Sequence, residues 1–222
     1  KIRFMPNATD FVYPDDADKR KAIVRNKYGV LGDDKLFLFV GRLVTQKNIL
    51  FIVEVLRRLK ERGLVFRMLY VGDGPDKKKL ENKIIEEGVE KECVLVGKIS
   101  DKDLIKDYYL AADMVLFPSK YDVSSLIQIE AAAMKTPCAF MEGSVTSCTI
   151  TGGVDGLILP DDADGFAEGV YDLVTDGEKL ENMSEMAYKN VYVTWERVSS
   201  LALERYKRLA EKSRDVKQAE DE

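Results

Sequence analysis

Two basic side chains, Arg42 and Lys47, stand in the segment VGRLVTQKN (40–48), directly after the apolar run LFLFVG (36–41). The apolar run predicts a buried strand, and Gly41 at its end lets the backbone approach a ligand closely. Two cations beside the N-terminus of the next helix suit a diphosphate group. The alternative is that both are solvated surface charges. The segment is neither a P-loop nor a dinucleotide fingerprint, because it contains no G-x-x-x-x-G-K-[ST] and no G-x-G-x-x-G.

Two acidic residues, Asp122 and Glu130, belong to the stretch PSKYDVSSLIQIEAAA (118–133). We expect Asp122 in a loop, with Ser124 and Ser125 in the first turn of the following helix, where backbone N–H groups are free. Glu130 falls two turns inside that apolar helix. Its carboxylate must face a cleft or a partner, because burying an unpaired charge is costly. The structural alternative is that Asp122 caps the helix and Glu130 forms an ion pair.

A third candidate is the turn GDGP (72–75), which follows the apolar run VFRMLYV (65–71). Its first interpretation is a strand-to-helix turn in which glycine supplies unusual backbone angles. A backbone contact with a ligand stays open, because the turn borders the crevice described next.

These candidates share one position in the predicted fold, the end of a strand. Strands at 36–41, 65–71, 93–96 and 114–117, apolar except for Arg67, alternate with helical patterns, and no hairpin dipeptide separates them. This alternation is typical of an α/β fold with a doubly wound, Rossmann-like parallel sheet. The carboxyl ends of such strands share one edge, where ligands bind. We therefore expect the turns at Gly41, Gly72, Gly97 and Pro118 to border a common crevice.

The C-terminal part of the chain is predicted to be helical. Helical patterns cover 163–175, 178–191 and 195–213, and the polar tail 214–222 is expected to fray. Residues 1–213 are therefore interpreted as one domain.

The composition excludes several classes of function. The 222 residues contain no histidine, which excludes a Ser-His-Asp or Cys-His mechanism within this chain and any histidine-ligated metal. A formal net charge of −5 predicts no broad nucleic-acid surface. Three cysteines without a C-x-x-C pair are typical of reduced thiols in a cytoplasmic protein.

A series of segments spread over nearly the whole chain has matches, in the same order, in a single family. They are MPNATDFVYP, VGRLVTQKN, YVGDGP, VLVGKIS, AADMVLFPSKYD, IEAAAMKTP, VDGLILPDD and TWERVSSLALERY. In these segments the chain resembles the C-terminal, donor-binding domain of retaining nucleotide-sugar glycosyltransferases with the two-domain GT-B fold. Trp195 matches an aromatic residue of the family's closing helix and is interpreted as a packing anchor.

The resemblance implies a role for each matching residue. Arg42 and Lys47, after Gly41, match the pair that neutralises the donor diphosphate, where negative charge grows as the sugar–phosphate bond breaks. Asp122 matches an acid that contacts the transferred sugar, and Glu130 matches an acid that binds the ribose hydroxyls. Ser124, Ser125 and Leu126 match a turn that holds the sugar and phosphates. Lys98 and Ile99 match a segment that packs on the base.

The resemblance also implies partners and a cellular setting. The donor would be a UDP- or GDP-sugar, used without a metal or other cofactor, and a hexose would pass with retention to an acceptor on an N-terminal domain absent from this chain. This half alone would be inactive. The setting would be cytoplasmic, with peripheral membrane association of the full-length enzyme in the synthesis of a cell-envelope polysaccharide or glycolipid.

The sequence departs from the family pattern at Asp122, where glutamate is usual, and at Val123-Ser124-Ser125, where the usual turn is rich in glycine. The alternatives are therefore a non-catalytic nucleotide-sugar-binding module or partner subunit, and a doubly wound domain that binds another phosphosugar.

Overall fold

The computed structural model describes residues 5–122 and 126–220. Within them, a parallel sheet of six strands has the order β3-β2-β1-β4-β5-β6. The strands are β1 (Lys35–Val40), β2 (Phe66–Val71), β3 (Cys93–Gly97), β4 (Met114–Phe117), β5 (Cys138–Met141) and β6 (Leu157–Leu159). The sequence-based prediction of a doubly wound α/β fold is confirmed.

The sheet is the centre of the hydrophobic core. The side chains from Leu36 to Phe39 in β1 are fully buried, and all of β4 is buried as well. Strands that are apolar on both faces need cover on both faces. The helices that provide it are α1 (Ala17–Lys27), α2 (Ile49–Glu61), α3 (Lys77–Glu86), α4 (Lys102–Ala111), α5 (Leu126–Ala133), α6 (Ala163–Val174) and α7 (Gly177–Asn190).

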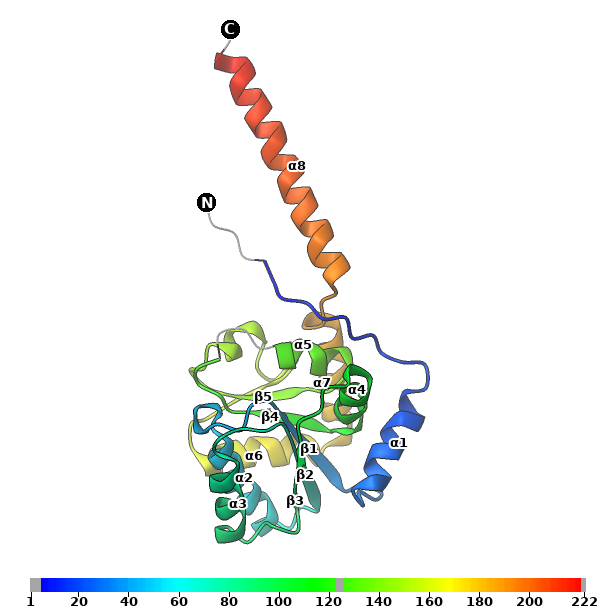
Figure 1. Ribbon diagram of the computed structural model, residues 1–222, viewed down its shortest axis with the longest axis vertical. Helices are drawn as coiled ribbons and strands as arrows, with labels where there is room; N and C mark the ends of the chain where they lie inside the picture. The colour runs from blue at the N-terminus through cyan, green and yellow to red at the C-terminus, as the bar shows by residue number, and fades with distance from the viewer. Residues whose placement is uncertain (1–4, 123–125, 221–222) are drawn as a thin grey trace.

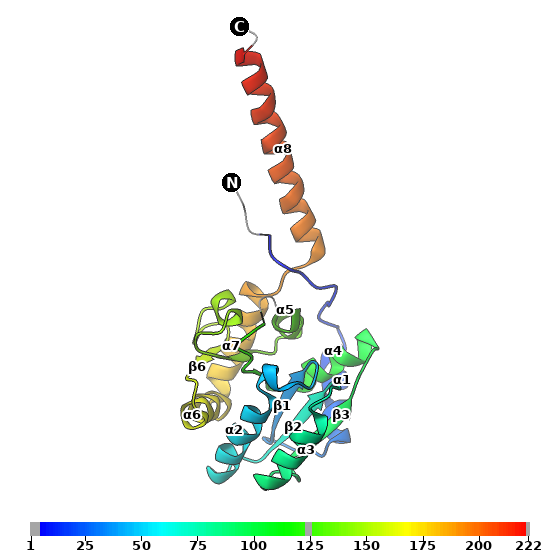
Figure 2. The same cartoon turned by 60° about the vertical axis from the view of Figure 1, so that its left-hand side comes forward.

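The helices pack in two groups around the sheet. Helix α2 packs against α3 and α6, whereas α4 packs against α1 and α5, and α5 packs against α7. Figures 1 and 2 show the sheet between α2 and α3 on one side and α1 and α4 on the other. This is the arrangement that right-handed crossovers produce when the chain leaves the central strand in both directions.

The strand order reverses between β1 and β4, which are neighbours in the sheet. Successive strands run outward from β1 to β3 on one side and from β4 to β6 on the other. The loops that follow β1 and β4 therefore diverge at this switch point, where open α/β sheets bind their ligands.

Helix α1 and strand β6 are among the elements that were not predicted from the sequence. Helix α1 buries only Ala17 and Val24, so its apolar signal is weak, and ion pairs from Arg20 to Asp107 and from Arg25 to Asp113 attach it to the domain. Strand β6 is only three residues long, and Ile158 in its middle is exposed.

The helix predicted at 195–213 extends further in the structure. Helix α8 (Trp195–Glu220) continues past 213 and projects from the domain (Figure 1). The segment SRDVKQAEDE contains neither glycine nor proline, so nothing in it stops a helix. Among the described helices, α8 included, none has the length and apolar character needed to cross a bilayer.

Candidate functional site

The loop after β1 is held in place by the turn after β2. The Leu43 N–H donates to the Asp73 carbonyl oxygen at 3.0 Å, and the Asp76 N–H donates to the Leu43 carbonyl oxygen at 3.1 Å. Asp76 also accepts from the backbone N–H of Thr45 at 2.8 Å and from its hydroxyl at 2.9 Å. The hydrogen bond from Lys79, with those from Thr45, lowers the pKa of Asp76 to about 2, so this anchor is ionised at neutral pH.

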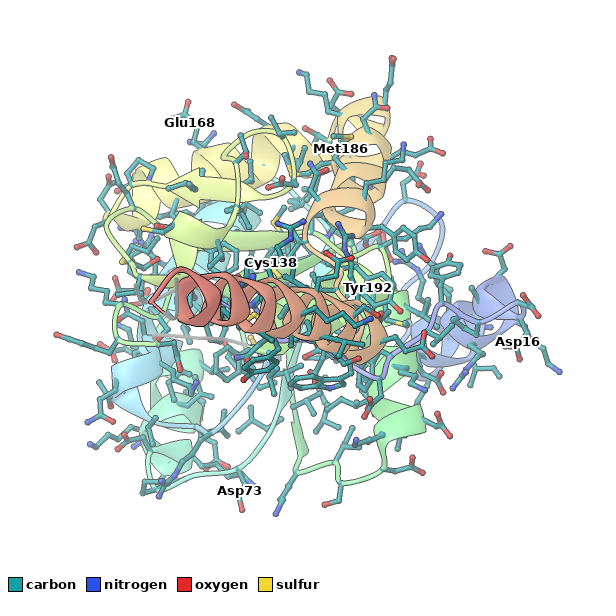
Figure 3. The ribbon with its side chains drawn as sticks, turned by 90° about the horizontal axis from the view of Figure 1, so that it is seen from above. Asp16, Asp73, Cys138, Glu168, Met186 and Tyr192 are labelled. Carbon is teal, nitrogen blue, oxygen red and sulfur yellow. The ribbon has the colours of Figure 1, made fainter. Side chains whose placement is uncertain are left out.

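The glycines of the turn at 72–75 are required by this close approach. A Cβ on Gly72 would lie 1.8 Å from the Gly41 carbonyl oxygen, and one on Gly74 would lie 2.3 Å from that of Leu43. Gly72 also has a φ of +150°. The side chain of the intervening Asp73 is exposed and points to the rim of the domain (Figure 3). The turn therefore supports the loop after β1.

The loop after β1 borders a cavity of about 380 Å³ at the carboxyl edge of the sheet. Its lining includes Gly41, Arg42, Gly72, Lys98 and Ile99. Three of the four turns expected at a common crevice thus meet here, since the third turn places Lys98 directly after Gly97 and the Gly72 N–H donates to the Gly97 carbonyl oxygen at 2.9 Å.

Arg42 is one of the two cations, with Lys98, that line this cavity. Its side chain is exposed, and within residues 5–122 and 126–220 its guanidinium forms no ion pair or hydrogen bond. An unpaired guanidinium presents donors in a planar fork that matches phosphate oxygens. Arg42 is therefore an exposed charge that borders a cavity, and the alternative of a solvated surface charge predicts the same exposure.

A second cavity, of about 250 Å³, adjoins the first. The two share Ile99 and Ile105 as lining residues. Leu126 and Glu130 of α5 line the second cavity, and Trp195 at the start of α8 lines it as well. Six of the sequence-predicted residues therefore border two neighbouring cavities, namely Gly41, Arg42, Lys98, Ile99, Leu126 and Glu130.

Glu130 reaches its cavity from inside an apolar helix. Its Oε2 accepts a hydrogen bond from the Tyr109 hydroxyl at 3.0 Å. Burial raises the pKa of Glu130, and the Tyr109 hydrogen bond and the charge of Lys102 oppose that rise. The carboxylate faces a cleft, as predicted, and its partner among the described residues is a phenol and not the cation of a structural ion pair.

Lys47 and Asp122 contact each other across the switch point. The Lys47 Nζ lies 3.0 Å from both carboxylate oxygens of Asp122 and 5.2 Å from the centre of the Phe117 ring. The adjacent Asn48, which has a left-handed φ of 59°, donates to the Pro118 carbonyl oxygen at 3.3 Å. The loops after β1 and β4 are therefore joined, and Pro118 belongs to this junction.

Ser124 and Ser125 lie outside the described residues, so their predicted roles remain hypotheses. The structure adds Tyr109 and Asp76, which the sequence did not single out because neither belongs to a motif with a chemical reading of its own. Trp195 is 48% exposed and lines the second cavity, which corrects its interpretation as a packing anchor.

The fold at this site is that of the Rossmann-like half of GT-B glycosyltransferases. Sucrose-phosphate synthase from Thermosynechococcus elongatus superposes with a TM-score of 0.78 at 24% identity, over 93% of this chain and 52% of that one. The structure of Anabaena HepE in complex with UDP and glucose superposes with a TM-score of 0.76 at 16% identity, over 94% of this chain and 56% of that one.

The chain belongs to the family of glycosyl transferases group 1, whose pattern matches residues 20–190. An uncharacterized glycosyltransferase of Methanocaldococcus jannaschii is 29% identical over 192 residues, which cover 85% of this chain and 49% of that protein. The chain spans about half the length of the curated relatives that it matches first.

Proposed function

We propose that this chain binds a UDP- or GDP-linked sugar and is the donor-binding domain of a retaining glycosyltransferase that transfers a hexose. The observation that carries the proposal is Arg42, whose guanidinium is unpaired among the described residues and borders the cavity formed by the strand-end turns of the switch-point sheet. Family membership supports transfer chemistry. The complex of Anabaena HepE with UDP and glucose supports a nucleotide-sugar donor.

In this proposal the two neighbouring cavities divide the donor between them. The first, with Arg42 and Lys98, takes the diphosphate, because both cations and the turn at Gly41 face it. The second, with Glu130, takes the ribose, whose vicinal hydroxyls are donors that suit a carboxylate. Ile99 lines both cavities and in this proposal packs against the base.

The chemical task of the cations is to stabilise the leaving diphosphate. Negative charge on the phosphate oxygens grows as the bond to the sugar breaks, so fixed cations favour the transition state over the ground state. Arg42, Lys47 and Lys98 would do the work of a divalent metal. We therefore expect UDP to bind with the same affinity in excess EDTA as in excess magnesium, measured by calorimetry, and a large loss of affinity on chelation would contradict this.

We also propose that the acceptor is bound by an N-terminal domain that this chain does not include, and that the chain alone binds donor without transferring sugar. The length of the matched relatives, about twice the matched region, supports this division. Radiolabelled UDP-glucose incubated with the chain should yield no glycosylated product.

Titration calorimetry with UDP and GDP tests the binding proposal. Arg42→Ala should weaken binding at least tenfold, because hydrogen bonds to charged groups are worth about 1.5–3 kcal/mol each. Arg62→Ala is the matched control, since it removes the same charge from a residue that lies over the Tyr171 ring and lines neither cavity. Equal effects of the two substitutions, or no binding of either nucleotide, would overturn the proposal.

A further inference from the structure

Lys47 and Arg42 both belong to the loop after β1, but only Lys47 forms an ion pair with a described residue. The Lys47 ammonium already has an anion, since both carboxylate oxygens of Asp122 lie 3.0 Å from it. The Arg42 guanidinium has no such partner among the described residues. A diphosphate entering the site would therefore meet one cation that is available and one that is engaged.

The position of the Lys47 stem shows where its ammonium can go. A Cβ built on Gly41 would lie 3.5 Å from the Lys47 Cδ, so the stem passes over Gly41, which lines the diphosphate cavity. Rotation about the terminal bonds of this flexible side chain carries the ammonium from Asp122 toward that cavity.

The Lys47–Asp122 pair can open at modest cost. The two side chains keep 20% and 27% of their surface exposed, so water partly replaces each contact when the pair separates. Contact with water lowers the net free energy that an ion pair contributes. The Phe117 ring, 5.2 Å from the ammonium, favours the present position but supplies no competing negative charge.

We propose that Asp122 occupies Lys47 in the empty site and that a nucleoside diphosphate displaces it. The ammonium exchanges the carboxylate for phosphate oxygens, and the released carboxylate of Asp122 becomes free to accept hydroxyl groups of the sugar. Asp122 is then a competitor of the diphosphate as well as a ligand of the sugar. This inference rests on the proposed function of the site.

The proposal makes an unusual prediction for Asp122→Asn. Loss of this acid should tighten binding of the bare nucleoside diphosphate by about two- to fivefold, because Lys47 no longer has to leave a carboxylate. A residue that only contacts the sugar would leave the affinity for the bare nucleotide unchanged. Calorimetry uses the 222-residue chain with whichever of UDP and GDP binds the wild type more tightly.

Two further variants separate this mechanism from a general change in charge. Asp176→Asn is the matched control, because Asp176 also pairs with a lysine, Lys179, at 2.9 Å, and asparagine caps its helix as aspartate does. It should leave the affinity unchanged. In a Lys47→Ala background Asp122→Asn should have no effect, since the group that it releases is absent.

The outcomes distinguish this inference from the function on which it rests. If Arg42→Ala weakens binding and Asp122→Asn fails to tighten it, the exchange is overturned and the donor site stands. An equal gain from Asp122→Asn with and without Lys47, or from Asp176→Asn, also overturns it. If Arg42→Ala has no effect, the donor site itself is refuted.

Discussion

Alanine at position 74 isolates the contact that holds the loop after β1. The new Cβ would lie 2.3 Å from the carbonyl oxygen of Leu43, 2.7 Å from its nitrogen and 2.8 Å from its carbonyl carbon. All three are backbone atoms, so no side chain can rotate away. The φ of Gly74 lies outside the left-handed region, so the cost comes from the contact and not from backbone strain.

The magnitude follows from the displacement that relieves the contact. Carbon and oxygen atoms in proteins ordinarily approach to about 3.3 Å, so the two loops must separate by about 1 Å. The hydrogen bonds between Leu43 and the turn, at 3.0 and 3.1 Å, would then be lost or strained, at about 1 kcal/mol each. With about 1–2 kcal/mol for overpacking, we expect Gly74→Ala to lower the free energy of unfolding by about 3 kcal/mol.

Urea denaturation followed by circular dichroism measures this loss, and calorimetry with UDP measures its consequence for the site. Gly177→Ala is the matched control, because a Cβ there meets nothing within 4 Å and Gly177 begins α7. The control should be neutral or stabilising by up to about 1 kcal/mol. Affinity for UDP should fall in Gly74→Ala alone, since the loop that carries Arg42 moves. If the two variants are equally stable, the reasoning is refuted.

Two further predictions concern acidic groups at the site. The folded-state pKa of Asp76, about 2, lies below its ordinary value of 3.8, because Lys79 and Thr45 donate hydrogen bonds to it. The contribution of Asp76 to stability is therefore present above about pH 4 and is lost as the pH falls toward 2. Asp76→Asn should remove that part of the acid dependence of stability, measured by urea denaturation at a series of pH values. An unchanged acid dependence would contradict this assignment. Tyr109→Phe removes the hydrogen bond that opposes the raised pKa of Glu130, so this pKa should rise further. The decline of UDP affinity on acidification should then begin at a higher pH than in the wild type, as measured by calorimetry at a series of pH values. Superimposable pH profiles would show that the phenol does not influence the carboxylate.

Strong local patterns account for what could be predicted. Four of the strands are short, mainly apolar runs, a pattern typical of buried parallel strands. Gly41, Arg42 and Lys98 follow strand ends, so the topology alone brings them to one edge of the sheet. Prediction failed where the local signal is weak. Helix α1 has few buried side chains, and its attachment through Arg20 depends on residues distant in the chain.

The site shows the same division. Glu130 was expected to face a cleft or a partner, because burying an unpaired carboxylate in an apolar helix is costly. Its partner Tyr109 could not be predicted, since the pair joins α4 to α5 and no pattern in either helix encodes the contact. Nor does any spacing predict that Lys47 would be engaged by Asp122, 75 positions further along the chain.

The sequence by itself determined the class of the fold, the edge of the sheet that holds the candidate site and the family, because strand patterns and ordered motifs are local properties of the chain. It also excluded histidine chemistry within these residues, since composition is independent of folding. Only the tertiary structure decided which charges are available. Among the described residues Arg42 is unpaired, Lys47 is engaged and Glu130 is hydrogen-bonded to a phenol. The physical reason is that the state of a charge depends on what lies within a few ångströms of it, and loops from separate strands set that distance.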